Sequence, residues 1–380
     1  MMRFDAWEKD TLEMYIARSE LAPIAEKVFA GERLTFEDGV ALYRSNDLLT
    51  LGALANFVRE KKNGNVAYYI INRHINPTNI CFVDCQLCAF ARKVGEEGGW
   101  TMSIEEVVQT AARGYTESVR EFHIVGGLHP YLPFQYYVDL LRALKYHFPN
   151  VHLKAFTCVE LDYLAKLAGK SLHETIAILK DAGLDSVPGG GAEIFARRVR
   201  DIICTHKISG ERWLEVARAV HECGLKSTAT MLYGHVETYE ERVDHLLRLR
   251  ALQDETGGFT AFIPLAFHPE NTRLSHLPWT TGMDDLKNIA VARLLLDNFD
   301  HIKAYWIMMG PKLAQVALRF GADDLDGTVI EEKIYHMAGG QTPQGLTRAQ
   351  IEHLIRQAGR VPVERDSLYN PVAPAATASA

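Results

Sequence analysis

Residues 76–90 read Asn76-Pro-Thr-Asn-Ile-Cys-Phe-Val-Asp-Cys-Gln-Leu-Cys-Ala-Phe90 and hold three cysteines, Cys81, Cys85 and Cys88, within eight positions. Four thiolates would close a structural metal site. Three on one tight loop can instead hold a four-iron cluster and leave one iron open to a small molecule. The Cys-x3-Cys-x2-Cys spacing therefore predicts a [4Fe-4S] cluster with a reactive iron.

A zinc site is the main alternative, and it requires a fourth ligand. His74 could complete such a site, whereas the next cysteine, Cys158, stands alone far along the chain. A disulfide framework fits worse, because 6 cysteines in 380 residues are sparse and no secretory segment precedes them. We expect the scattered Cys158, Cys204 and Cys223 to be buried side chains that bind no metal.

Composition bounds the class of protein. A chain of 380 residues with 47% hydrophobic content can bury the core of one large barrel or of two ordinary domains. A net charge of −7 without a Lys/Arg block argues against nucleic acid as a partner. No stretch approaches the roughly 18 apolar residues of a membrane span. We expect a cytoplasmic protein that acts on small molecules, in a compartment that keeps thiols reduced.

Strand-like and helix-like segments alternate along most of the chain. Helical periodicity marks 12–16, 24–29 and 48–58, which predicts an N-terminal helical extension over 1–65. Eight β-rich runs follow, at 67–75, 121–125, 151–157, 185–187, 227–232, 259–264, 302–308 and 326–330. Helical candidates separate them, at 103–114, 134–147, 172–182, 211–223, 240–255, 283–298 and 311–320.

Eight such repeats favour an α/β fold, a (β/α)8 TIM-type barrel over 66–340. A helix at 348–358 lies in a C-terminal helical segment over 341–370. The small residues of 371–380 predict a disordered tail.

Polar residues follow the runs, at the strand ends where such barrels carry their reactive groups. They are Gly126, Gly127 and His129 after the second run, Glu160 after the third, Gly190 and Glu193 after the fourth, Tyr233 and His235 after the fifth, His268 and Asn271 after the sixth, and Lys312 after the seventh. Glycines let a ligand approach the backbone amides closely, and acids can bind an ammonium group or ribose hydroxyls. Together they suit a zwitterionic nucleotide such as S-adenosylmethionine, although a single histidine in such a place is more often structural.

The cysteine loop resembles the signature of the radical S-adenosylmethionine (SAM) superfamily. The stretches His123-Ile-Val-Gly-Gly-Leu-His-Pro130 and Ile263-Pro-Leu-Ala-Phe-His-Pro-Glu-Asn271, with 188–194, 231–238 and 252–259, resemble its menaquinone- and deazaflavin-pathway branch. The similarity runs from about 66 to 340. Leu128 replaces an acid that the superfamily often has after the paired glycines, so we expect Glu160 or another acid to share the binding of the methionine amino group.

The resemblance implies a reaction. A 5′-deoxyadenosyl radical, made from SAM at the reduced cluster, would add to the enol ether 3-[(1-carboxyvinyl)oxy]benzoate. Aryl migration and loss of the carboxyl group would give 6-amino-6-deoxyfutalosine, so SAM is consumed. His129, His235, His268, Asn271 and Lys312 are the nearest candidates to bind the two carboxylates, and the glycines, Glu193 and Tyr233 to bind the nucleoside. The electron donor would be a flavodoxin or a ferredoxin.

Two other functions stay open. One is the sister dehypoxanthine futalosine cyclase reaction, in which the radical abstracts hydrogen. The other is a non-catalytic carrier of the cluster, which would need no nucleotide pocket. The oligomeric state does not follow from the sequence.

Overall fold

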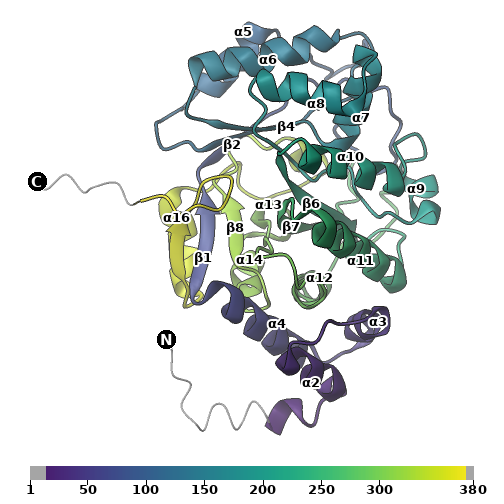
Figure 1. Ribbon diagram of the computed structural model, residues 1–380, viewed down its shortest axis with the longest axis vertical. Coiled ribbons are helices and arrows are strands. Elements are labelled where there is room, and N and C mark those ends of the chain that lie inside the picture. Colours follow the sequence, from purple (N-terminus) through teal and green to yellow (C-terminus); the bar gives the residue numbers. More distant parts are fainter. Residues whose placement is uncertain (1–13, 374–380) are drawn as a thin grey trace, which may run out of the picture.

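Parallel strands form a barrel in the computed structural model, which describes residues 14–373 (Figure 1). One sheet has the order β2-β3-β4-β5-β6-β7. Its strands are β2 (Asn72–Ile75), β3 (Glu121–Ile124), β4 (His152–Ala155), β5 (Ser186–Val187), β6 (Lys226–Tyr233) and β7 (Phe259–Ala266). Parallel bridges from Phe262 to Ile302 and from Lys303 to Asp324 lead on to β8 (Asp324–Gly327), which pairs with β1 (Val66–Ile70). The predicted TIM-type barrel is thereby confirmed.

Two of the predicted strands differ from the structure. The run 67–75 forms two strands, β1 and β2, which face different neighbours: β1 pairs with β8, and β2 pairs with β3. The run 302–308 contributes only single bridges before the chain turns into helix α13 (Trp306–Met309). The turn places the Trp306 indole within 2.8 Å of the Gly327 carbonyl oxygen, to which it donates. A buried indole N–H requires such a partner.

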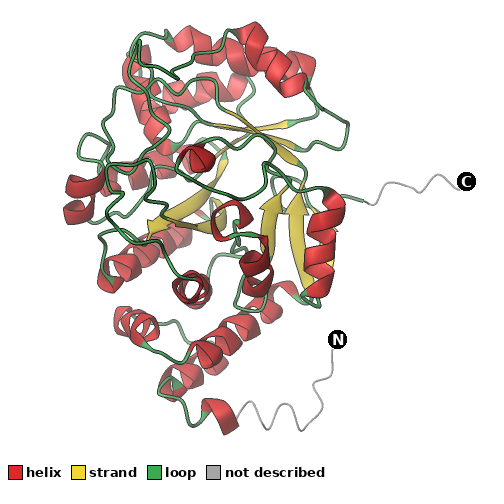
Figure 2. Cartoon of the chain, turned by 180° about the vertical axis from the view of Figure 1, so that it is seen from behind, coloured by secondary structure: helices red, strands yellow, loops and turns green. Residues whose placement is uncertain are grey.

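Helices surround the strands, as Figure 2 shows from behind. They are α5 (Ile104–Ala112), α6 (Phe134–His147), α7 (Cys158–Ala168), α8 (Leu172–Asp181), α9 (Arg197–Ile203), α10 (Gly210–Glu222), α11 (Tyr239–Thr256), α12 (Gly282–Leu295) and α14 (Pro311–Ala317). Capping boxes begin α5, α7, α8 and α11, so the first backbone amides of these helices have partners. Helices α7 and α9 were not predicted.

The N-terminal segment packs against the outside of the barrel. It comprises α2 (Ala22–Ala30), the unpredicted α3 (Phe36–Arg44) and α4 (Leu48–Asn63), and the predicted helix 12–16 lies partly outside the described residues. Helix α4 contacts α12, and α3 contacts α11. The Tyr43 hydroxyl donates to Asn288 Oδ1 at 2.9 Å, in a buried contact that ties α3 to α12.

The C-terminal segment is not only helical, which corrects the prediction for 341–370. After α15 (Ile334–Met337) and α16 (Arg348–Gln357) comes a strand, β9 (Val361–Glu364), which pairs with β1 on the side opposite β8. Just beyond it, Arg365 Nε lies 2.5 Å from Asp324 Oδ2, and both side chains are buried. The predicted disordered tail falls outside the described residues from 374 onward.

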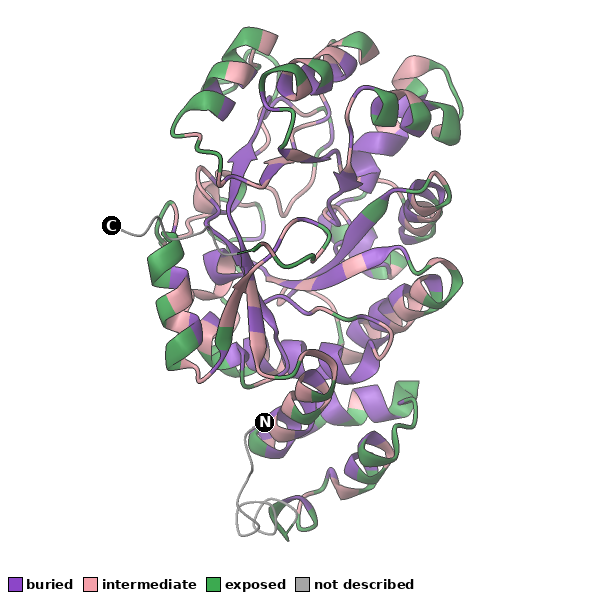
Figure 3. Cartoon of the chain, turned by 60° about the vertical axis from the view of Figure 1, so that its left-hand side comes forward, coloured by how far each residue is buried: buried purple, intermediate pink, exposed green. Residues whose placement is uncertain are grey.

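Burial follows this architecture, because the strands are mostly buried and the outer faces of the helices are exposed (Figure 3). Among the described residues, no helix combines the length and the apolar character needed to cross a bilayer. The barrel interior also carries paired charges. Lys154 Nζ lies 2.6 Å from Glu121 Oε2, and Lys303 Nζ lies 3.1 Å from Asp326 Oδ1. These pairs are unusual there, because the interiors of such barrels are usually filled by branched apolar side chains.

Candidate active site

A cavity of about 340 Å³ opens at the carboxyl ends of the strands. Cys81, Cys85 and Cys88 all line it. Other parts of the barrel, which are strands, the loops after them and short helices, contribute the polar residues Glu160, Glu193, Lys207, His268, Asp326, Glu332 and Tyr335. Residues far apart in the sequence therefore share one chamber with the three thiols.

Cationic side chains hold the cysteine loop in place. Lys93 Nζ donates to the carbonyl oxygens of Cys81, Phe82 and Val83 at 3.2, 3.1 and 3.3 Å. Arg273 forms an ion pair with Asp84 on the same loop, with Nη1 and Oδ2 3.0 Å apart. The loop is thus fixed from two sides, and its thiols remain free to bind a ligand.

The cysteine loop fits a cluster that is bound by three thiolates. All three cysteines are free thiols. Within residues 14–373, no three His, Cys, Asp or Glu side chains converge tightly enough to hold a single metal ion. A four-iron cluster is bound through three different irons, so its thiolates need to share one opening, and all three of these cysteines line the same cavity. Burial raises the pKa of Cys85 to about 12, and the nearby Lys207 ammonium opposes that rise. Iron would bind the deprotonated thiols.

Gly126 lines the cavity, as expected, but the amides of both paired glycines are bound within the chain. Gly126 N donates to Glu160 Oε1 at 3.1 Å, and Gly127 N donates to the Thr78 carbonyl oxygen at 2.9 Å. A Cβ on Gly127 would stand only 2.3 Å from the carbonyl oxygen of Ile80. Gly127 is therefore required where the chain leading to Cys81 passes.

Glu193 and Lys207 form a buried ion pair on the cavity wall. Lys207 Nζ lies 2.5 Å from Glu193 Oε1. Burial opposes ionisation of Glu193, but the Lys207 ammonium outweighs burial and lowers the pKa of the carboxyl group. The backbone at Glu193 is left-handed, with φ at 47°. An ion pair of this kind has an ammonium group and a carboxylate, which are complementary to the two charged groups of a zwitterionic ligand.

Glu160 lies at the third position of α7. Its Oε2 accepts from Thr157 N at 2.7 Å and completes the capping box of that helix. Burial raises the pKa of Glu160 to about 7, against these hydrogen bonds. A nearby ammonium group would favour the ionised form of the carboxyl.

His268 lines another part of the cavity wall. Its Nε2 lies 3.2 Å from the Met308 carbonyl oxygen and contacts the Tyr335 hydroxyl, which donates to the same carbonyl at 2.8 Å. His268 Nδ1 is buried and has no hydrogen-bond partner in the described part of the chain. Burial lowers the pKa of His268 to about 4, so the ring is neutral at pH 7.

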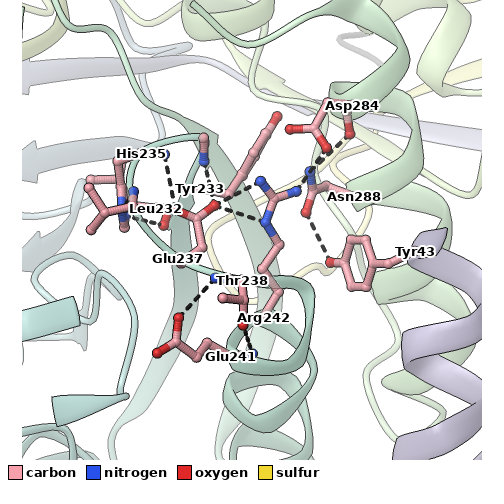
Figure 4. A network of polar contacts seen from close by, with 12 residues as sticks. Tyr43, Leu232, Tyr233, His235, Glu237, Thr238, Glu241, Arg242, Asp284 and Asn288 are labelled. Carbon is pink, nitrogen blue, oxygen red and sulfur yellow. Dashed lines mark hydrogen bonds and ion pairs between the residues drawn. The ribbon is translucent and has the colours of Figure 1, made fainter. Parts of the chain in front are cut away.

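Tyr233 and His235 do not line the cavity, which corrects the expectation for the fifth strand end. Their side chains belong to the polar network of Figure 4, where Glu237 faces Arg242 and Arg242 faces Asp284. The Tyr233 hydroxyl donates to Asp285 Oδ1 at 2.8 Å, and His235 Nε2 lies 3.0 Å from the Leu232 carbonyl oxygen. These contacts occupy both side chains.

Three further candidates also lie outside the cavity lining. His129 Nδ1 accepts from the amides of Tyr131 and Leu132, both at 3.1 Å, and so closes its own loop. Asn271 Nδ2 donates to the Met337 carbonyl oxygen at 3.1 Å, and Lys312 is exposed on α14. Of the candidates for carboxylate binding, His268 alone lines the cavity.

Sequence reasoning missed several residues of the cavity lining, among them His123, Lys207 and Tyr335, and it considered His74 only as a possible zinc ligand. One signal could have found the strand histidines: each lies within two residues of the last residue of its predicted strand. The structure makes them register partners on neighbouring strands. Lys207 gave no local signal. Gly190 does line the cavity, whereas Cys158, Cys204 and Cys223 do not.

Comparisons with known proteins identify the relatives of the chain. Family models for the "Radical SAM superfamily" and the "CofH/MqnC C-terminal region" match residues 75–249 and 256–377. An aminodeoxyfutalosine synthase from Thermus thermophilus is 54% identical, over 93% of this chain and 96% of its own length. A cyclic dehypoxanthine futalosine synthase from Streptomyces coelicolor is 38% identical, over 93% of this chain and 89% of its own. The crystal structure of methylornithine synthase has the same fold, with a TM-score of 0.69 at 17% identity, over 89% of this chain and 96% of that one.

Proposed function

The chain belongs to the radical SAM superfamily, and from this membership we propose that it catalyses the aminodeoxyfutalosine synthase reaction. In that reaction the adenosyl group of SAM is joined to the enol ether 3-[(1-carboxyvinyl)oxy]benzoate. The observation that carries the proposal is the single cavity in which three free thiols meet polar groups from several strand ends. A mere carrier of a cluster would need the thiols alone. The higher identity to the synthase than to the cyclase supports the choice between those two reactions.

Cys81, Cys85 and Cys88 would hold the [4Fe-4S] cluster. When bound there, the cluster supplies the electron that cleaves SAM into methionine and the 5′-deoxyadenosyl radical. The Lys93 contacts to three loop carbonyls keep the thiols facing the cavity during this step. The chain itself contributes position and the exclusion of water.

Charged groups beside the thiols would bind SAM. The Lys207 ammonium would bind its carboxylate, and Glu160 would accept from its amino group in place of the acid that Leu128 replaces. Glu193, which lies beside Gly190 and Gly191 on the same loop, would accept from ribose hydroxyls. A lost hydrogen bond to a charged group costs on the order of 1.5–3 kcal/mol.

His268 and Tyr335 would contact the enol ether. The neutral His268 ring has one committed nitrogen and one without a partner among the described residues, so it can still bond to substrate. The electron donor would be a flavodoxin or a ferredoxin. Because the cluster requires thiols that are not oxidised, we place the protein in the cytoplasm.

Product analysis tests the proposal. The anaerobically reconstituted protein is incubated with reductant, the enol ether and SAM labelled in the adenosyl carbons. The label should enter a nucleoside that contains the aryl group, with methionine formed in equal amount. If the label is released only as 5′-deoxyadenosine and dehypoxanthine futalosine is consumed when offered, the cyclase assignment replaces ours. If a fully reduced cluster cleaves no SAM, the protein is instead assigned as a carrier of the cluster.

A further inference from the structure

Two histidines form a stacked pair on the barrel strands. His74 on β2 and His123 on β3 are paired in register. Their rings lie nearly parallel, with an interplanar angle of 9° and centroids 4.5 Å apart. Both line the cavity. Because they project from the strands and not from the loops that follow, they lie deeper in the barrel than the cysteine loop.

Neither ring is committed to a protein partner. In the described part of the chain, no protein atom hydrogen-bonds to the imidazole of His74 or His123, although carboxylates are near: Glu121 Oε1 is 4.0 Å from His123 Nδ1, and Glu332 and Asp326 act on His74. The other oxygen of Glu121 is bound by Lys154. By contrast, the buried ring of His245 hydrogen-bonds to the carbonyl oxygen of Thr230. A stacked pair of rings that lines a cavity and has no hydrogen-bond partner in the described chain is suited to bind a ligand.

Few cations are free to meet an anion in this cavity. Among the described lining residues, Lys207 is the single lysine or arginine, and it is paired with Glu193 beside the cysteine loop. Lys154, which is the register partner of His123 on β4, and Lys303 are each paired with a carboxylate. The carboxylates of Asp326 and Glu332 share this lining, and Asp326 is paired with Lys303, so the imidazole N–H groups of the pair are the donors left for an incoming carboxylate. Burial lowers the pKa of both histidines, so each neutral ring has one N–H to donate.

We propose that the His74–His123 pair binds a carboxylate group of the aryl acceptor, by N–H donation from the two stacked rings. The inference rests on the proposed function, because that acceptor carries two carboxylates and the cavity wall offers one lysine. The pair would thus position the acceptor. SAM would bind elsewhere, at Lys207 and the acids beside the thiols.

Binding of an unreactive analogue tests this role apart from turnover. The probe is 3-[(1-carboxyethyl)oxy]benzoate, which keeps both carboxylates and lacks the double bond. Its affinity for the reconstituted holoenzyme is measured by calorimetry in the presence of SAM. His74→Phe and His123→Phe keep a flat ring for stacking but remove the donors. His152→Phe is the matched control, because this histidine of β4 bonds to Ser186 Oγ and does not line the cavity.

Each Phe variant should bind the analogue about 10- to 100-fold more weakly, as expected for loss of a hydrogen bond to a charged group. Affinity for SAM, and for the dimethyl ester of the analogue, should stay within about twofold of the parent, because a single carboxylate contact is removed. His123→Gln, which restores an N–H donor, should recover part of the loss. It also serves as the test variant if His123→Phe does not fold.

Parent-like affinity for the diacid in folded His74→Phe and His123→Phe would overturn the inference and leave the pair as packing. An equal loss for the diacid and the dimethyl ester would overturn it as well, because the defect would then not depend on the carboxylate. The proposed function fails differently, since in that case the parent protein would form no adduct from the enol ether.

Discussion

Replacement of Gly127 by Ala should disrupt the cysteine loop. The added Cβ would lie 2.3 Å from the Ile80 carbonyl oxygen and 3.0 Å from Cys81 Cβ. Nonbonded atoms need roughly 3.5 Å, so the backbone before Cys81 would have to retreat by about 1 Å. Gly127 does not have a positive φ, so the steric clash of the added Cβ is the only expected cost. Overpacking of this kind costs about 1–3 kcal/mol.

Gly282→Ala is the matched control, because a Cβ there would meet Leu313 carbons at 3.4 and 3.5 Å, which is ordinary contact. Both variants are reconstituted anaerobically. Iron per chain and the free energy of unfolding in urea are then compared with the parent. Gly127→Ala should lose about 1–3 kcal/mol and bind substoichiometric iron, whereas Gly282→Ala should keep both values. A Gly127→Ala protein with full iron and parent stability would refute the role assigned to this glycine.

Three other substitutions test the site. Cys88→Ala should abolish SAM cleavage and lower the iron content, whereas Cys158→Ser should keep both; full iron in the first or lost iron in the second contradicts the ligand assignment. Lys207→Met leaves Glu193 buried without its cation and should cost about 3–5 kcal/mol of unfolding free energy in urea, and a cost near zero would argue against a buried pair. Because burial raises the pKa of Glu160 to about 7 from its usual 4.5, its stabilising contribution is full below pH 4.5 and is lost as the pH rises through 7. Relative to Glu160→Gln, the parent should therefore lose up to about 1.4 kcal/mol per pH unit across this window, and a slope of opposite sign would refute the shift.

The sequence predicted the barrel and the cysteine loop because both depend on local patterns. Strand–helix alternation identified most elements, and the spacing of Cys81, Cys85 and Cys88 lies within one loop. Where the pattern failed, a tertiary contact decided the backbone. The Trp306 indole bonds to Gly327 and ends the seventh run, and the pairing of 361–364 with β1 makes a strand of a segment predicted to be helical.

The candidate site was only partly predictable, because position at a strand end does not say which way a side chain points. His268 lines the cavity, whereas His235 at the preceding strand end is held by Leu232 and Glu237. His74 and His123 lie within strands, so a search for substrate contacts in the loops did not include them, and His74 was considered only as a zinc ligand. Lys207 is recognised through its pairing with Glu193, and that contact exists only in the folded chain.

The pairing of β9 with β1 has a consequence for where the chain can be shortened. Strand β1 has neighbours on both sides, β8 and β9, and Arg365 neutralises the buried Asp324. A protein that ends at Gly340 would keep every cysteine and every residue of the cavity lining, yet it would expose the backbone amides and carbonyls along one side of β1. Such an open strand recruits other chains. The shortened protein should therefore be lost to self-association during purification before its chemistry could be assayed.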